Sequence, residues 1–172
     1  MTSVDPQLLT GLGSAASIFL ASAGAAIASS HSGLYAVRGN DLKAFAPIII
    51  AGVLAIYGII VSVLLVFTFK DDMTQVEGYR NLSAGLAVGL ACAASGLGLA
   101  TFMKQINEHH PTMVPHSTSI VSPESEPLVG RHTNGTFQQN QQPISFVYLC
   151  SCLVFLEAIG LYGLIVALFL MA

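Results

Sequence analysis

One acidic side chain lies inside the most apolar part of this 172-residue chain. Glu157 stands in the closing stretch FLEAIGLYGLIVALFLMA, where most of its neighbours are aliphatic or aromatic. Desolvation disfavours the charged form of a carboxyl group, so Glu157 is expected to be protonated unless a cation, a basic group or water reaches it. A group that crosses apolar surroundings only when protonated is suited to carrying protons. The sequence therefore predicts proton binding at Glu157, in preference to a structural hydrogen bond across a helix interface.

Two residues near Glu157 are candidate neighbours of the site. Gly160 lies three residues further on, on the same face of a helix, and would leave space beside the carboxyl group. Tyr162 lies five residues on and off that face, so a packing role is at least as well supported. Sodium fits this site less well than a proton, because sodium needs several oxygen ligands and the flanking residues are apolar. No catalytic residue, metal site or cofactor is predicted.

The composition places Glu157 in a membrane protein. Hydrophobic residues make up 53% of the chain and charged residues only 9%, whereas soluble domains carry about 25% charged residues. The net charge of -3 lacks the basic footprint of a nucleic-acid-binding protein, so no nucleic-acid partner is expected. Helices are expected in the apolar runs, because lipid offers unpaired backbone groups no partner. Four runs reach the roughly 20 residues that cross a bilayer, at about residues 8–30, 46–69, 82–103 and 144–172.

The first and third runs are rich in Gly, Ala and Ser, whereas the second and fourth carry Ile, Val, Leu and Phe. In the third run, Gly85, Gly89 and Ala93 recur every four residues, and Gly96 lies four residues before Ala100. Small residues at this spacing let helix backbones approach closely. Ordinary helix pairing explains such a pattern, but two thin helices in one short chain favour a tighter arrangement, such as a crowded inner ring.

The alternation of thin and bulky runs predicts an internal repeat. The stretch GVLAIYGIIVSVLLVF from Gly52 aligns with EAIGLYGLIVALFLMA from Glu157 when Tyr57 is placed on Tyr162. In this alignment Gly52 takes the position of Glu157. Only the second copy of the repeat therefore keeps the acid.

The expected fold class is an all-α membrane protein with four transmembrane helices, arranged as two duplicated helical hairpins that assemble into a ring. The first hairpin covers residues 8–69 and the second covers residues 82–172. The second includes an inserted loop at about 104–143, which is rich in Ser, Thr, Gln and Asn and is predicted to be disordered. Its histidines are irregularly spaced, which favours solvated loop residues over a metal site.

The basic residues predict an orientation, because cytoplasmic loops carry an excess of Lys and Arg. The first and third loops hold four basic residues, and the second loop region holds two. We therefore expect the first and third loops in the cytoplasm and both termini outside or luminal; the family resemblance described below favours luminal termini. The first group is Arg38, Lys43, Lys104 and Arg131, and the second is Lys70 and Arg80.

The chain resembles the proteolipid c subunit family of the V-type proton ATPase over most of its length. The strongest stretches are PIIIAGVLAIYGIIVSVLL from Pro47, LSAGLAVGLACAASGLGLATF from Leu82 and FLEAIGLYGLIVALFL from Phe155. The closing pattern E-x-x-G-L-Y-G-L-I-V-A-L is highly specific in a four-helix membrane chain. One departure from the family is the third loop, where about residues 105–134 look inserted.

The resemblance implies a ring of copies of this chain and related proteolipids in a vacuolar, lysosomal or other acidic endomembrane compartment. The first and third helices would line the ring, and Glu157 would be the family's proton-carrying glutamate. The ring would turn against the stator a subunit, beside an arginine, and would contact the central-stalk d subunit. ATP would be hydrolysed in a separate soluble sector, since this chain has no GxxxxGK[ST] phosphate-binding loop. One acid per four helices means fewer protons per turn, which favours a pump over a synthase.

Two other classes of protein fit part of the pattern. A proton-coupled small multidrug-type transporter is also a four-helix chain with one membrane glutamate, but that acid lies in the first helix, among aromatic residues. A structural four-helix channel or junction protein would explain the small residues but not an acid in the middle of a membrane helix. Replacement of Glu157 by Gln separates these classes, because each predicts a different lost activity.

Overall fold

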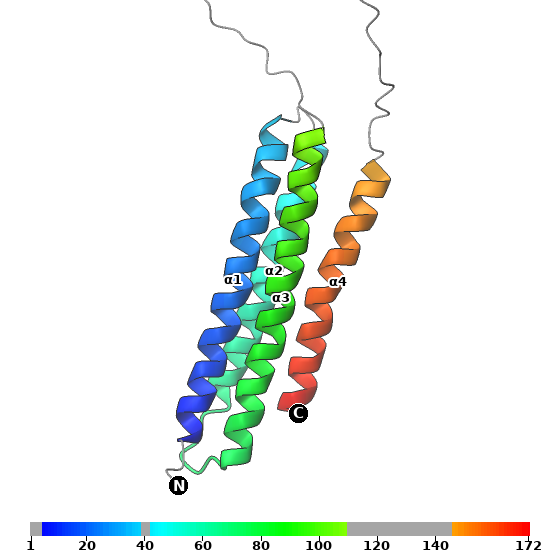
Figure 1. Cartoon of the computed structure of the whole chain (residues 1–172). Helices are drawn as coiled ribbons and strands as arrows, with labels where there is room; N and C mark the ends of the chain where they lie inside the picture. The colour runs from blue at the N-terminus through cyan, green and yellow to red at the C-terminus, as the bar shows by residue number, and fades with distance from the viewer. Residues whose placement is uncertain (1–4, 39–41, 110–145) are drawn as a thin grey trace, which may run out of the picture.

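The computed structural model describes residues 5–38, 42–109 and 146–172 of the chain. In these ranges the chain forms four long helices and one short 3-10 helix, with no strand. The elements are α1 (Pro6–Arg38), η1 (Leu42–Phe45), α2 (Ala46–Phe67), α3 (Gln75–His109) and α4 (Phe146–Met171). Figure 1 shows the four helices side by side and alternating in direction, so that the start of α1 and the end of α4 lie at the same end of the bundle.

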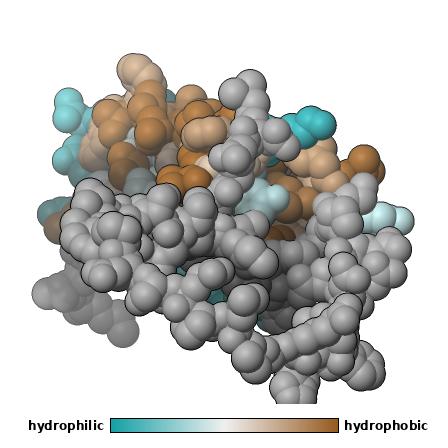
Figure 2. Space-filling view, turned by 90° about the horizontal axis from the view of Figure 1, so that it is seen from above, coloured by the Kyte–Doolittle hydropathy of each residue, from teal (hydrophilic) through white to brown (hydrophobic). Residues whose placement is uncertain are grey.

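The outward faces of the helices suit lipid rather than water. All four helices are long and apolar enough to cross a membrane. Large apolar side chains point outward along them, and Phe67, Phe155 and Phe169 are each 78% exposed. The end-on view in Figure 2 shows hydrophobic residues over much of the visible helix surface. The chain is therefore an all-α, multi-pass integral membrane protein, as the apolar runs predicted.

Two of the four helices, α1 and α3, extend beyond the membrane runs that the sequence predicted. α2 and α4 match their predicted runs to within two residues. α1 and α3 are longer than the predicted runs at 8–30 and 82–103, because helix continues through polar residues beyond the apolar segments. α3 also takes in residues 104–109, which the sequence assigned to the inserted loop. The predicted disorder of the remainder, residues 110–143, falls outside the described residues.

The start of α3 is fixed by a reciprocal pair of side-chain hydrogen bonds. The Thr74 backbone N–H donates to Glu77 Oε2 at 2.8 Å, and the Glu77 backbone N–H donates to Thr74 Oγ1 at 3.3 Å. This arrangement is a capping box, which satisfies backbone donors that a helix leaves free in its first turn. The short connection from α2 therefore leads into a helix with a defined first residue.

Glycines bring α1 and α3 into backbone contact, as the small-residue pattern predicted. A Cβ atom on Gly85 would collide with the backbone of Gly13, and one on Gly96 would collide with the backbone of Gly24. In each helix the two glycines are 11 residues apart, close to three helical turns, so both contacts lie on one face. Close packing at two levels makes α1 and α3 the central pair of the bundle.

The other two small residues singled out in α3 lie on the same interface. A Cβ atom on Gly89 would lie 3.0 Å from the Ala16 carbonyl oxygen, and one on Gly24 would lie 2.8 Å from Ala93 Cα. A larger side chain at any of these positions would push the helices apart. All four α3 positions therefore lie against α1.

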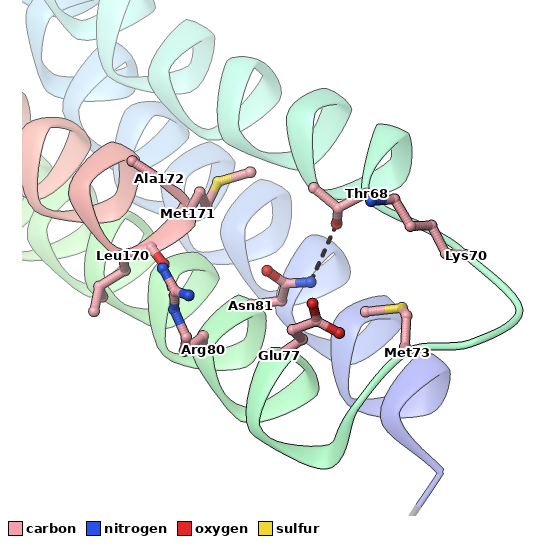
Figure 3. Close-up of a pocket in the computed structure, with 9 residues that line it drawn as sticks. All are labelled: Thr68, Lys70, Met73, Glu77, Arg80, Asn81, Leu170, Met171 and Ala172. Carbon is pink, nitrogen blue, oxygen red and sulfur yellow. Dashed lines mark hydrogen bonds between the residues drawn. The ribbon is translucent and has the colours of Figure 1, made fainter.

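Polar side chains hold the helices together at the end where α4 finishes. Arg80 Nε donates to the Leu170 carbonyl oxygen at 3.0 Å, which satisfies one of the acceptors that a helix leaves free in its last turn. Asn81 Nδ2 lies 3.1 Å from the hydroxyls of both Thr10 and Thr68. Figure 3 shows Arg80 and Asn81 of α3 together with Leu170 of α4 and with Thr68, which directly follows α2. The Arg80–Leu170 bond therefore ties the end of α4 to α3, and the Asn81 bonds tie α3 to α1 and to the end of α2.

Candidate functional site

Glu157 lies in the middle of α4. It is 11 residues after Phe146 and 14 residues before Met171, which at 1.5 Å per residue places it about 17 and 21 Å from the two ends of the helix. Within the described residues it is the one Asp or Glu that stands away from a helix end. Its side chain is partly buried, between α4 and the neighbouring helices. The sequence placed Glu157 near the midpoint of the fourth apolar run, and in the structure it lies near the middle of α4.

A tyrosine from α2 reaches the Glu157 carboxyl group. The Tyr57 hydroxyl donates a hydrogen bond to Glu157 Oε1 at 3.0 Å, and both side chains are partly buried. Tyr162, which the sequence offered as a neighbour, is 64% exposed. The phenol at the site is thus the counterpart of Tyr162 in the first half of the repeat. The repeat alignment held this signal, because it showed a tyrosine at the same position of both bulky helices.

Gly160 lets α2 approach α4 beside the carboxyl group. A Cβ atom at Gly160 would lie 2.7 Å from Leu54 Cδ2 and 3.5 Å from Cys92 Sγ. The expectation that Gly160 leaves open space is therefore wrong in its detail, because Leu54 occupies that space. Leu54 and the Tyr57 ring, at 3.7 Å from the same Cβ position, therefore pack against α4 at Gly160.

Ser95 of α3 fixes the α4 backbone next to Glu157. Its hydroxyl donates to the carbonyl oxygen of Leu156, the residue directly before Glu157. Ser95 is 1% exposed, so this bond is shielded from water and lipid. A Cβ atom on Gly98, one turn further along α3, would lie 3.0 Å from Leu156 Cδ2. The sequence analysis missed Ser95, since a serine within a Gly- and Ala-rich run gives no signal of which backbone atom it meets.

The equivalent position of the first hairpin has no acid and no close neighbour. Gly52 of α2 is exposed, and a Cβ atom built there would meet nothing within 4 Å. Position 52 therefore has room for a side chain, in contrast to the glycines between α1 and α3.

The site can bind and release a proton but offers few ligands to a metal ion. Its polar groups are the Glu157 carboxyl group and the Tyr57 hydroxyl, and Leu54 and Cys92 lie close to Gly160, one turn along α4. Across the described part of the chain, no group of three His, Cys, Asp or Glu residues gathers to hold a metal. The histidines of the inserted loop beyond His109 lie outside the described residues. The donor set here suits a proton, since sodium needs more oxygen ligands than these two side chains supply.

Four apolar helices, a glycine-packed central pair and a carboxyl group in the middle of the last helix define a membrane proteolipid. No protein-family model matches the chain. It is 31% identical over 165 residues to the human V-type proton ATPase 16 kDa proteolipid subunit c, covering 92% of this chain and 88% of the human protein. It is 32% identical over 167 residues to the V-type proton ATPase subunit c' of Saccharomyces cerevisiae, covering 92% of this chain and 84% of the yeast protein. The chain belongs to the V-type proton ATPase proteolipid subunit family.

Proposed function

We propose that this chain is a proton-carrying subunit of the rotor ring in the membrane sector of a V-type ATPase. Glu157 takes up a proton from one side of the membrane, crosses the apolar surroundings in its neutral form as the ring turns, and releases the proton on the other side. The observation that carries this proposal is the Tyr57–Glu157 hydrogen bond at the middle of α4. A partly buried carboxyl group there can exist neutral, or ionised when a donor and a cation stabilise it.

A positive group from another subunit completes this mechanism. Within the described helices, Lys and Arg stand near the helix ends, so the described part of the chain places no cation beside Glu157. The stator a subunit supplies the arginine and the aqueous paths along which the carboxyl group exchanges its proton. The Tyr57 hydroxyl stabilises the carboxylate during exchange, because a hydrogen bond to an ionised group is stronger than one to a neutral group.

The other partners and the compartment belong to the same proposal. Copies of this chain and related proteolipids form the ring, the central-stalk d subunit binds it, and a separate soluble sector hydrolyses ATP. The compartment is vacuolar, lysosomal or another acidic endomembrane compartment. The start of α1 and the end of α4 lie at the same end of the bundle in Figure 1. This arrangement is compatible with two luminal termini.

The small multidrug-type alternative has less support. The carboxyl group lies in the fourth helix against α2, with Leu54 and Cys92 nearby, and family membership points to the ATPase. A structural channel leaves the Tyr57–Glu157 pair without a role.

The proposal is tested with Glu157→Gln, which keeps the size of the side chain but cannot release a proton. ATP-driven acidification of vesicles is measured with the complete ATPase, and ring assembly is checked by native gel electrophoresis. We expect assembled rings that do not acidify. The matched control is Glu108→Gln, the same change at an exposed residue near the end of α3 that pairs with Lys104 at 3.9 Å, and it should acidify normally. Sustained pumping by rings built only from the Glu157→Gln chain would overturn the proposal.

A further inference from the structure

A pocket opens at the end of the bundle where α2 and α4 finish and α3 begins. Its volume is about 220 Å³, which is many times the space that one water molecule needs. Charged and polar side chains of α3 line it, together with the last residues of α4 and the connection between α2 and α3. In Figure 3, Glu77 and Asn81 lie between Arg80 on the α4 side and Lys70 on the side of the connection. The pocket is therefore a polar hollow shared by the ends of three helices.

Asn81 presents an unused acceptor to this pocket. The Thr10 hydroxyl donates to the Pro6 carbonyl oxygen at 3.0 Å. The Thr68 hydroxyl donates in the same way to the Leu65 carbonyl oxygen at 2.7 Å. A hydroxyl carries one proton, so both threonines can only accept from Asn81, which assigns Nδ2 to their side. Asn81 Oδ1 therefore points away from the threonines, as in Figure 3, and accepts no hydrogen bond from a described residue.

This unused oxygen needs a donor from whatever fills the pocket. Asn81 is only 6% exposed, so little bulk water reaches its side chain. A buried acceptor without a partner is costly, because folding removes it from water without replacing the lost hydrogen bond. The pocket side of Asn81 therefore calls for a ligand with an N–H or O–H group.

The charged side chains of the pocket are of both signs and are not paired with one another. Arg80 uses Nε to reach the Leu170 carbonyl oxygen, which is one of the five N–H donors of a guanidinium. Glu77 accepts at Oε2 from the Thr74 backbone N–H. Among the described residues, no ion pair joins Glu77 to Arg80 or to Lys70. Two cations and one carboxylate thus line the same pocket with most of their hydrogen-bonding capacity unused.

The pocket borders the surface that faces lipid. Phe67 directly precedes Thr68, Phe169 directly precedes Leu170, and both phenylalanines are 78% exposed. The membrane helices α2 and α4 end at this level, so the pocket lies where the apolar part of the bundle meets its polar end. A molecule with a polar head in the pocket and apolar chains against Phe67 and Phe169 matches both surfaces. A phospholipid is built in this way.

The mixture of charges selects among phospholipid head groups. A phosphate fits against Arg80, with Lys70 adding positive charge from across the pocket. A primary ammonium carries three N–H donors, enough for the Glu77 carboxylate and Asn81 Oδ1 together. A quaternary ammonium has no N–H donor, and an anionic head group without an ammonium leaves Glu77 without a counter-charge.

We propose that this pocket binds the head group of a phospholipid that carries a phosphate and a primary ammonium, the chemistry of phosphatidylethanolamine. The phosphate binds Arg80, and the ammonium donates to Glu77 and Asn81. The bound lipid joins the start of α3 to the ends of α2 and α4. Leu170 is 13 residues after Glu157, or about 20 Å along α4 at 1.5 Å per residue, so the lipid site is separate from the proton site. The inference does not depend on Glu157 carrying protons.

Native mass spectrometry of the complete membrane sector tests the head-group preference. The complex is equilibrated in detergent with equal amounts of dioleoylphosphatidylethanolamine and dioleoylphosphatidylcholine, and lipid adducts are measured on the ejected 18.0 kDa chain. The ethanolamine lipid should give about ten times as many adducts, because only it forms hydrogen bonds to the charged acceptor. Dioleoylphosphatidylglycerol, in place of the ethanolamine lipid, should give fewer adducts than that lipid. Equal adducts of the ethanolamine and choline lipids, or more of the glycerol lipid, would overturn the inference.

Glu77→Gln tests the ammonium site without removing the start of α3, since Gln also serves in a capping box. The ratio of ethanolamine to choline adducts should fall to near one, with the melting temperature in detergent unchanged. Glu108→Gln is the matched control at the other end of α3, and it should keep the original ratio. An undiminished ratio in Glu77→Gln would contradict the proposed role of its carboxylate.

A last arm separates a lipid from a small phosphate ester. Water-soluble phosphoethanolamine has the same head group but no acyl chains to lie against Phe67 and Phe169. At the concentration of the lipid it should leave the ethanolamine adducts unchanged. Displacement of the lipid at equal concentration would assign the pocket to a soluble phosphate ester and refute the lipid site. None of these readouts needs proton pumping, so they stand apart from the Glu157→Gln test.

Discussion

Removal of the Tyr57 hydroxyl should slow proton transfer at Glu157 without disturbing the fold. Tyr57→Phe keeps the ring that packs beside Gly160 and deletes only the group that donates to Glu157 Oε1 at 3.0 Å. Hydrogen bonds to charged groups contribute about 1.5–3 kcal/mol net. Tyr57 is only partly buried, so we take the lower figure. About 1.4 kcal/mol corresponds to a factor of ten, and the pumping rate should therefore fall by about tenfold.

The assay is the initial rate of ATP-driven acidification in vesicles that contain the complete ATPase, with ring assembly checked in parallel. Tyr162→Phe is the matched control, since it makes the same chemical change at the equivalent, 64% exposed position of α4. It should leave the rate near that of the unmodified chain. Wild-type rates from Tyr57→Phe would refute the reasoning that this bond stabilises the carboxylate. Equal losses from both variants would show a general need for phenols rather than a role at the site.

Three further substitutions test the packing and the repeat. Gly96→Ala drives a methyl group into the α1 backbone and should lower the free energy of unfolding by about 1–3 kcal/mol. The loss is measured as a lower melting temperature in detergent. Gly33→Ala is the control and should leave the melting temperature unchanged, because a Cβ atom at Gly33 meets nothing within 4 Å. Ser95→Ala removes the bond to the α4 backbone and should reduce pumping several-fold, with rescue by Ser95→Thr; unchanged pumping would contradict a positioning role. Gly52→Glu should assemble normally, because nothing lies within 4 Å of a Cβ atom at position 52. With a second acid per chain, it should lower the steepest pH gradient that the vesicles reach. Failure to assemble would contradict the open space at position 52.

The sequence was sufficient for the features that depend on local composition. Apolar runs predicted four membrane helices because a bilayer imposes a minimum length on any span. The spacing of Gly85 and Gly89 predicted close packing of α3, because only small residues allow helix backbones to touch. Glu157 stood out because an acid in a membrane run is energetically costly, so such residues are rare outside functional sites. Each inference needed no knowledge of which helices are neighbours.

The contacts between helices could not be predicted in the same way. Tyr57 and Glu157 are 100 positions apart in the chain, and their contact depends on the rotation and height of α2 against α4. The bond from Ser95 to a carbonyl oxygen of α4 depends on the same quantities. Gly160 was expected to leave space, but a gap on one helix is filled by whatever side chain the neighbouring helix presents, here Leu54. Relative placement of helices arises from summed packing, and local sequence does not encode it position by position.

The pairing of Gly52 with Glu157 has an energetic consequence under the proposed function. Each chain offers four helices and two equivalent mid-helix positions, but only one of these carries an acid. A full turn of the ring therefore moves half as many protons as a ring with both acids would move. For a fixed free energy of ATP hydrolysis per turn, each proton then receives twice as much. One pH unit costs about 1.4 kcal/mol per proton, so the steepest gradient the ring can build doubles when the second acid is absent.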